Sequence, residues 1–153
     1  LSRHLRQAAR SIGLCDEREQ LRIGVAVEEA LLNAYYHGNL EVSSKLREEN
    51  HRQFYDLARE RAGRMPYCSR RVHVEMRFTP EEAVFVIRDE GPGFDAARLP
   101  DPADPSNLER PCGRGVMLMR TFMDEIHYNE TGNQVTLIKR RSLVQMQTVG
   151  GGV

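Results

Sequence analysis

Two residues in the first quarter of the chain have types and spacing that suit metal and phosphate chemistry. Glu29 and Asn33 stand four positions apart, so they share one face if the segment is helical. An amide oxygen together with phosphate oxygens suits Mg²⁺, which prefers oxygen ligands and keeps several waters. A carboxylate beside that ion could deprotonate an attacking hydroxyl or water. Because helices routinely carry such pairs on their solvated faces, the pair alone is weak evidence.

A second segment places an acid beside two glycines, directly after an apolar stretch. Asp89 is costly to bury unless it meets a hydrogen-bond donor, and the exocyclic amine of an adenine is such a donor. Gly91 and Gly93 would let the backbone approach a flat ring closely. A solvated aspartate in a turn before glycine would show the same pattern.

A third segment combines two glycines with two arginines. Gly113 and Gly115 open a predicted helix, whose free N–H groups and dipole favour phosphate. Arg110 and Arg114 flank the turn and could supply charge to phosphate oxygens. A flexible loop with solvated arginines is the alternative, since a Gly-x-Gly pair is among the least specific motifs.

Hydrophobic periodicity predicts the helices that must position these residues. A short amphipathic helix is expected over residues 1–12, and a longer one over about 17–36, ended by a left-handed cap at Gly38. The charged stretch 41–64 predicts one surface helix or a pair, inserted before the sheet. A last helix is expected over about 116–123.

Alternating and continuous apolar runs predict the strands. Strands are expected over residues 72–78 and 83–89, and a closing hairpin over 126–128 and 134–139. Between them, residues 94–112 contain four prolines and predict a long loop, which in a compact domain is usually functional.

Length and composition restrict the class of protein. The chain has 153 residues with 22 basic and 22 acidic side chains, which predicts one domain and no overall charge that favours nucleic acid. No apolar run approaches the roughly 20 residues that span a bilayer, and no signal peptide is expected. The first residue is Leu rather than Met, which suggests a piece of a longer protein. Three widely spaced cysteines predict reduced thiols in a cytoplasmic protein: Cys15, Cys68 and Cys112.

Taken in order, the three segments resemble the motifs of the GHKL superfamily of ATPases and kinases. Within it, the chain is more similar to the small anti-sigma-factor serine kinases, whose first motif also runs on through a His-Gly pair. The resemblance covers roughly residues 1–140, apart from the insertion, and depends on these segments: 29–34, 37–38, 88–95, 113–115 and 119–125.

This resemblance implies an α+β fold, a two-layer α/β sandwich known as the Bergerat ATP-binding fold. Its sheet is mixed and mainly antiparallel, with helices on one face. A single ATP-binding domain is therefore expected over residues 1–140, with a charged helical insertion at about 41–68. Residues 141–153 are expected to form a disordered tail.

The resemblance also implies a role for each candidate residue. Glu29 would be the catalytic base, Asn33 the Mg²⁺ ligand, and Asp89 the residue that binds the adenine of ATP. Residues 94–112 would form a lid over ATP, in which Arg110 faces the terminal phosphate. The remaining residues would shape the pocket or contact the nucleotide: Gly91, Gly93, Gly113, Arg114, Gly115 and Asn133. Of these, Asn133 stands where relatives often have a threonine that holds adenine through water.

The implied activity is that of a serine/threonine-protein kinase that phosphorylates a STAS-domain anti-anti-sigma protein and holds a sigma factor inactive. Such kinases are usually homodimers, and no direct contact with nucleic acid or membrane is expected. Two alternatives remain open. One is a non-catalytic, ATP-gated binding module that forms the output domain of a larger signalling protein. The other is a histidine-kinase catalytic domain, although no phosphoacceptor helix precedes the motifs in this sequence.

Overall fold

The computed structural model describes residues 17–95 and 114–141. The helix predicted over residues 1–12, most of the predicted lid and the predicted tail lie outside these residues. Among the candidate site residues, Arg110 and Gly113 also lie outside them, and Arg114 is described by its backbone alone.

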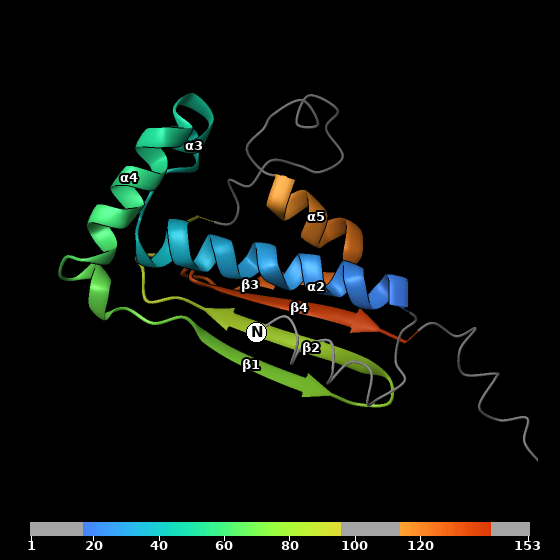
Figure 1. The fold of residues 1–153 in the computed structure, drawn as a ribbon. Coiled ribbons are helices and arrows are strands. Elements are labelled where there is room, and N and C mark those ends of the chain that lie inside the picture. Colours follow the sequence, from blue (N-terminus) through green and yellow to red (C-terminus); the bar gives the residue numbers. More distant parts are fainter. Residues whose placement is uncertain (1–16, 96–113, 142–153) are drawn as a thin grey trace, which may run out of the picture.

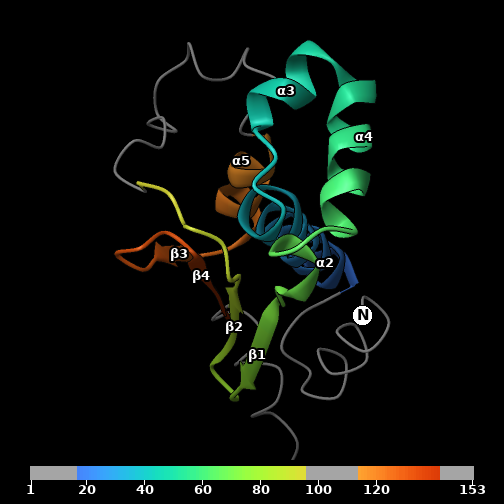
Figure 2. The same cartoon turned by 90° about the vertical axis from the view of Figure 1, so that its left-hand side faces the viewer.

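Four antiparallel strands form a single sheet in the described part of the chain. In spatial order they are β1 (His73–Phe78), β2 (Glu82–Arg88), β4 (Gln134–Arg140) and β3 (Glu125–Tyr128). Two helices, α2 (Glu17–Leu32) and α5 (Arg114–Phe122), lie side by side over one face of this sheet (Figures 1 and 2). The predicted two-layer α+β fold with helices on one face is therefore confirmed.

The core lies between the sheet and the two helices. Phe85 in β2 pairs with Leu137 in β4, so the two side chains share a face, and they are 1% and 0% exposed. On α2, Ala26 and Ala30 are also buried, and their small side chains let the helix approach its neighbours closely. On α5, Met119 is 1% exposed and completes the same core. The apolar residues that recur with period two in the strands and with period 3.6 in the helices therefore pack together in one core layer.

The long helix does not end as predicted. After Leu32 the chain continues as η1 (Asn33–Asn39), a π-helical segment with wider turns. The left-handed residue that follows is Glu41, with φ of 54°, so the predicted left-handed cap at Gly38 is wrong. Two arginines bind the free carbonyl groups of this helix end instead. Arg61 donates to the carbonyls of Leu40 and Glu41 at 2.8 and 2.7 Å, which places positive charge at the helix C-terminus.

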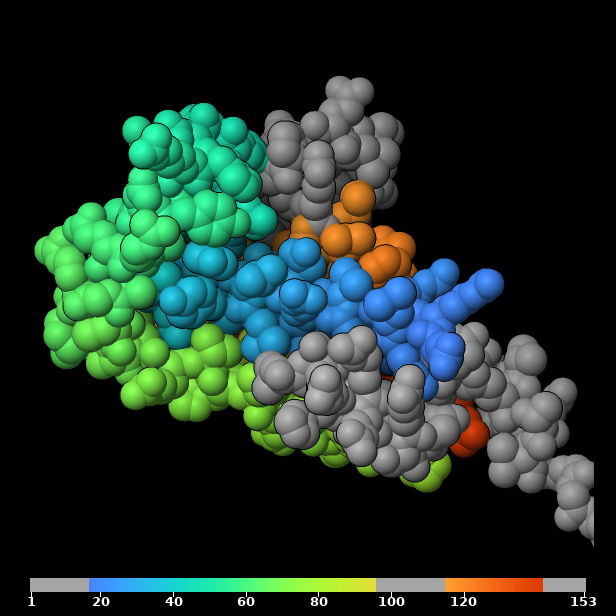
Figure 3. All heavy atoms as spheres, in the orientation of Figure 1, coloured from blue at the N-terminus to red at the C-terminus, as the bar shows by residue number. Residues whose placement is uncertain are grey.

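The predicted insertion is a helix pair with a small core of its own. Helix α3 (Ser44–Glu49) is followed by α4 (His51–Ala62) and by a 3₁₀ turn, η2 (Tyr67–Ser69). Asn50 caps α4 by accepting a hydrogen bond from the Gln53 N–H at 3.0 Å. Phe54 is fully buried among Leu40, Val42 and Ala58. In the space-filling view, α3 and α4 form a lobe at one end of α2 (Figure 3).

Among the described helices, none is long and apolar enough to cross a membrane.

Replacing Phe85 by alanine should lower the free energy of unfolding by about 3–5 kcal/mol, because it leaves a cavity at the centre of the core. Urea denaturation measures this. The control is Met76→Ala: Met76 is the cross-strand partner of Phe85 but is 40% exposed, so its loss should cost less than about 1 kcal/mol. Equal losses in the two variants would contradict this description of the core.

Candidate functional site

Helix α2 and its continuation η1 bring Glu29 and Asn33 to the first turn of α5. Gly115 lies so close to them that a Cβ built on it would be 2.6 Å from Glu29 Oε2 and 3.7 Å from Asn33 Nδ2. Both side chains are half-buried. A carboxylate, an amide and the N-terminal turn of a helix therefore meet at one place, although 86 positions separate Glu29 from Gly115. That N-terminal turn has free N–H groups that can bind phosphate.

The carboxyl group of Asp89 lies directly on the backbone of Gly38. A Cβ on Gly38 would be 2.3 Å from Asp89 Cγ, and a Cβ on Gly91 would be 2.2 Å from the Gly38 carbonyl oxygen. Contacts this short leave no room for a side chain at either position. The His-Gly pair therefore ends in a glycine because the carboxyl group of Asp89 occupies the space beside it.

Asp89 is a buried acid with unused capacity to accept hydrogen bonds. It is 8% exposed, and burial raises its pKa above the ordinary 3.8. The N–H of Gly91 donates to Oδ1 at 2.8 Å and, with the charge of Arg70, opposes that rise in pKa. A further donor from a ligand, such as an adenine amine, would stabilise the ionised carboxylate.

The backbone of Asp89 is held by the turn between β3 and β4. Its N–H donates to the Asn133 carbonyl at 2.9 Å, and Asn133 Nδ2 donates to the Asp89 carbonyl at 3.3 Å. Asn129 in turn donates from Nδ2 to Asn133 Oδ1 at 2.8 Å. Both polar atoms of the Asn133 side chain thus have protein partners. The contact with adenine that the resemblance implies for Asn133 stays a prediction.

Two glycines let the segment after Asp89 lie against the same turn. Gly93 and Gly132 have φ of 75° and 76°, a conformation that side chains rarely allow. A Cβ on Gly93 would be 2.0 Å from the Thr131 carbonyl oxygen. Beside them, Phe94 packs edge-on against Tyr128 with ring centres 5.2 Å apart, and burial raises the pKa of Tyr128.

The described residues can hold Mg²⁺ only in part. Within residues 17–95 and 114–141, no three His, Cys, Asp or Glu side chains cluster closely enough to hold a metal ion. Asn33 beside Glu29 offers one amide oxygen, which suits an ion that takes its other ligands from phosphate and water. The donor set therefore fits Mg²⁺ that arrives with a nucleotide.

The structure brings together the candidate residues of each segment that it describes, and it adds three that were not candidate site residues. Gly38 was expected to end a helix and was part of the His-Gly pair of the resemblance, Gly132 was placed only in the turn of the closing hairpin, and Asn129 was not considered. Their roles depend on contacts between distant segments, which spacing along the chain does not reveal.

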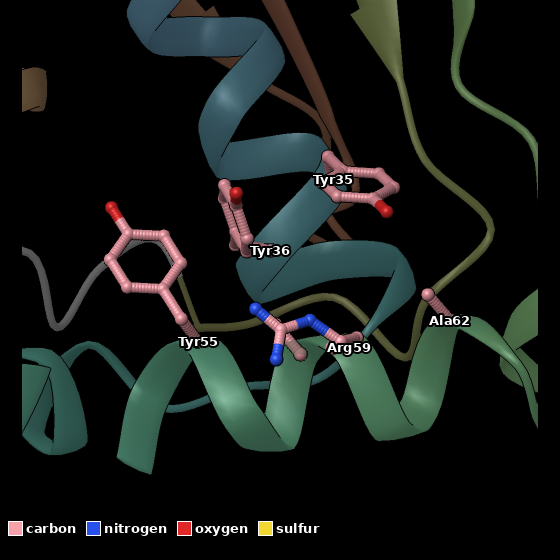
Figure 4. A pocket seen from close by; sticks show the side chains of 6 residues that line it. Tyr35, Tyr36, Tyr55, Arg59 and Ala62 are labelled. Atoms are coloured by element: carbon pink, nitrogen blue, oxygen red, sulfur yellow. The ribbon is translucent and has the colours of Figure 1, made fainter. Parts of the chain in front are cut away.

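A separate pocket of about 320 Å³ lies between η1 and α4 (Figure 4). None of the candidate nucleotide residues lines it. Its walls come from α4 and the π-helix η1: Tyr35, Tyr36, Tyr55, Ala58, Arg59 and Ala62.

Comparison with protein-family models gives a match over residues 1–139, to the model described as the histidine kinase-like ATPase domain. This match covers most of the chain. No curated protein matches the sequence.

Gly38→Ala should weaken ATP binding at least tenfold, because the new methyl group must displace the Asp89 carboxyl group. Isothermal titration calorimetry with ATP and Mg²⁺ measures this. The matched control is Gly24→Ala on the same helix, where a Cβ would meet nothing within 4 Å. That change should leave binding unaltered and stabilise the fold by about 0.5–1 kcal/mol. Unchanged ATP binding in Gly38→Ala would contradict a position of the adenine beside Asp89.

Adenosine affinity should fall as the pH drops through the pKa of Asp89, because protonation removes the charged acceptor. Since that pKa is raised, the fall should begin above the range of an ordinary aspartate, near 3.8. Adenosine carries no phosphate, but its ring nitrogen N1 protonates near the ordinary pKa of an aspartate, so the fluorescence titration is run above that pH, and Asp89→Asn reports any contribution from groups other than the carboxyl. In Asp89→Asn the affinity should be lower and nearly independent of pH. A wild-type profile as flat as that of the variant would contradict the role of Asp89.

Proposed function

The chain belongs to the histidine kinase-like ATPase domain family, and we propose that it is an ATP-dependent protein serine/threonine kinase of the anti-sigma-factor type. Its substrate would be a serine or threonine on a STAS-domain antagonist, and its second partner a sigma factor that it holds inactive, as a homodimer. The main support for this proposal is the position of Glu29. Glu29 is half-buried beside Asn33 and within reach of the first turn of α5, where a phosphate group would bind.

In this proposal Glu29 acts as the general base. It takes the proton of the substrate hydroxyl while the hydroxyl oxygen attacks the terminal phosphorus of ATP, so that one P–O bond forms, another breaks, and ADP leaves. Mg²⁺ bound through Asn33 and the phosphates would neutralise charge that develops on the transferred group. Asp89 would hold the adenine at the other end of the site.

The absence of a side chain at Gly115 supports a phosphate site at this position. A Cβ there would approach Glu29 Oε2 to 2.6 Å, so any larger residue would push the carboxylate aside. With glycine, the N–H groups of the first helical turn stay open to a ligand. This reasoning applies to Gly115 alone in the third segment, because Gly113 lies outside the described residues.

The non-catalytic binding module is the second candidate. It is favoured by the α3–α4 helix pair, which has its own buried cluster around Phe54 and presents a separate surface at one end of α2. In that case ATP would control access to a partner without phosphoryl transfer.

Glu29→Gln should lower phosphoryl transfer at least a hundredfold while ATP binding stays within about threefold of wild type, because the amide keeps the shape but cannot take a proton. Transfer is followed with γ-labelled ATP and purified STAS-domain proteins, and binding by calorimetry. The matched control is Glu28→Gln, which changes an exposed neighbour on the same helix and should leave both properties unaltered.

Full transfer by Glu29→Gln would exclude Glu29 as the base. ATP binding by the wild type without transfer to any STAS-domain protein would favour the binding module.

A further inference from the structure

Asn39 is a buried polar residue at the end of η1 that the proposed reaction does not use. It is 2% exposed, and its Oδ1 accepts a hydrogen bond from the N–H of Glu90 at 2.8 Å. Glu90 follows Asp89 directly, so this bond joins the helix that carries Glu29 and Asn33 to the turn that carries the adenine-binding acid. The two bonded residues are 51 positions apart in the sequence.

We propose that Asn39 is a positioning residue for base recognition, which sets where the Asp89 carboxyl group lies relative to α2. The inference rests on the proposed ATP site. Asn39 would not touch the nucleotide. It would act through the backbone of Glu90, and its loss would change which base the site prefers more than how the site holds phosphate.

The other side of the same turn is held independently. The carboxylate of Glu90 accepts from the Arg71 N–H at 3.0 Å and from His73 Nε2 at 2.8 Å, which ties it to the start of β1. Asn133 holds the backbone of Asp89 from the β3–β4 turn. These bonds fix the turn to the sheet. The Asn39 bond fixes the turn to the helix layer.

Asn39 is itself held in place. Arg70 donates from Nη1 to the Asn39 carbonyl at 2.8 Å, and the same guanidinium pairs with Glu41 at 2.6 Å. Both charged side chains of that pair are largely buried, at 17% and 33% exposed. A buried side chain with a fixed backbone cannot easily move to follow the turn. When the Asn39 side chain is removed, the turn therefore loses this hydrogen bond to the helix layer and keeps the packing of Asp89 and Gly91 against Gly38.

Removing this bond should affect the two ends of the site differently. Asp89 would accept a hydrogen bond from the adenine amine, whereas guanine has a carbonyl group at that position, which a carboxylate disfavours. A displaced Asp89 should weaken ATP binding and reduce the penalty against GTP. Glu29 and Asn33 meet Gly115, whereas the side chain of Asn39 bonds to Glu90, so the phosphate end should keep its affinity.

The test compares the dissociation constants of ATP and GTP by calorimetry, with Mg²⁺, in wild type and Asn39→Ala. We expect the ratio of the GTP constant to the ATP constant to fall about tenfold, almost entirely through weaker ATP binding. The matched control is Asn50→Ala, which also removes one Asn side-chain bond to a backbone N–H, at 3.0 Å, but at the start of α4. It should lower the melting temperature and leave the ratio unchanged.

An unchanged ratio in a folded Asn39→Ala, or an equal fall in Asn50→Ala, would overturn the inference. If Asn39→Ala does not fold, Asn39→Ser should show a smaller change in the same direction. If neither variant folds, the residue is a structural requirement and the inference is wrong. A wild type that binds neither nucleotide would instead reject the proposed ATP site itself.

Discussion

The structure depends on one constraint, the burial of the Asp89 carboxyl group against the backbone of Gly38. Burying a carboxyl group is unfavourable unless donors replace its water, and here the N–H of Gly91 and the backbone of Asp89 itself provide hydrogen bonds. The neighbouring positions must then be glycines, because a Cβ at 38 or 91 would overlap the carboxyl group or its support. The fold thus buries an acid whose carboxylate oxygens can still accept a hydrogen bond from a ligand.

Two arginines from the segment between η1 and β1 hold the helix end against which Asp89 is buried. Arg61 and Arg70 both stack on the Tyr67 ring, with guanidinium carbons 5.0 and 5.2 Å from its centre. Arg61 holds the carbonyls of Leu40 and Glu41, and Arg70 holds that of Asn39. The charge of Arg70 also opposes the rise in the pKa of Asp89 that burial causes. Arg61 in α4 and Arg70 after η2 therefore stabilise the end of η1, on which the acid lies.

Much of the fold could be predicted from the sequence because local patterns determine it. The strand predicted over 83–89 is β2, Glu82–Arg88, and the helix predicted from residue 17 is α2, which begins at Glu17. The left-handed cap at Gly38 was wrong because periodicity and glycine propensity describe a helix in isolation. The carboxyl group that demands Gly38, the Asn39 bond to Glu90, and the arginines that bind the helix end all come from residues 20 to 51 positions away.

The length of helix between two contacts sets the distance between the phosphate end and the adenine end of the site. Gly115 meets the helix at Glu29, and Asp89 meets it at Gly38, nine residues further on. At 1.5 Å per residue, α-helical geometry separates the two contacts by roughly 13 Å, the scale of an extended nucleotide. The last part of that interval is π-helical, with wider turns and a shorter rise than an α-helix. One continuous helix thus sets both the spacing and the relative direction of the phosphate end and the base end. A change in η1 after Asn33 would move the adenine end of the site while leaving Glu29 and Asn33 in place.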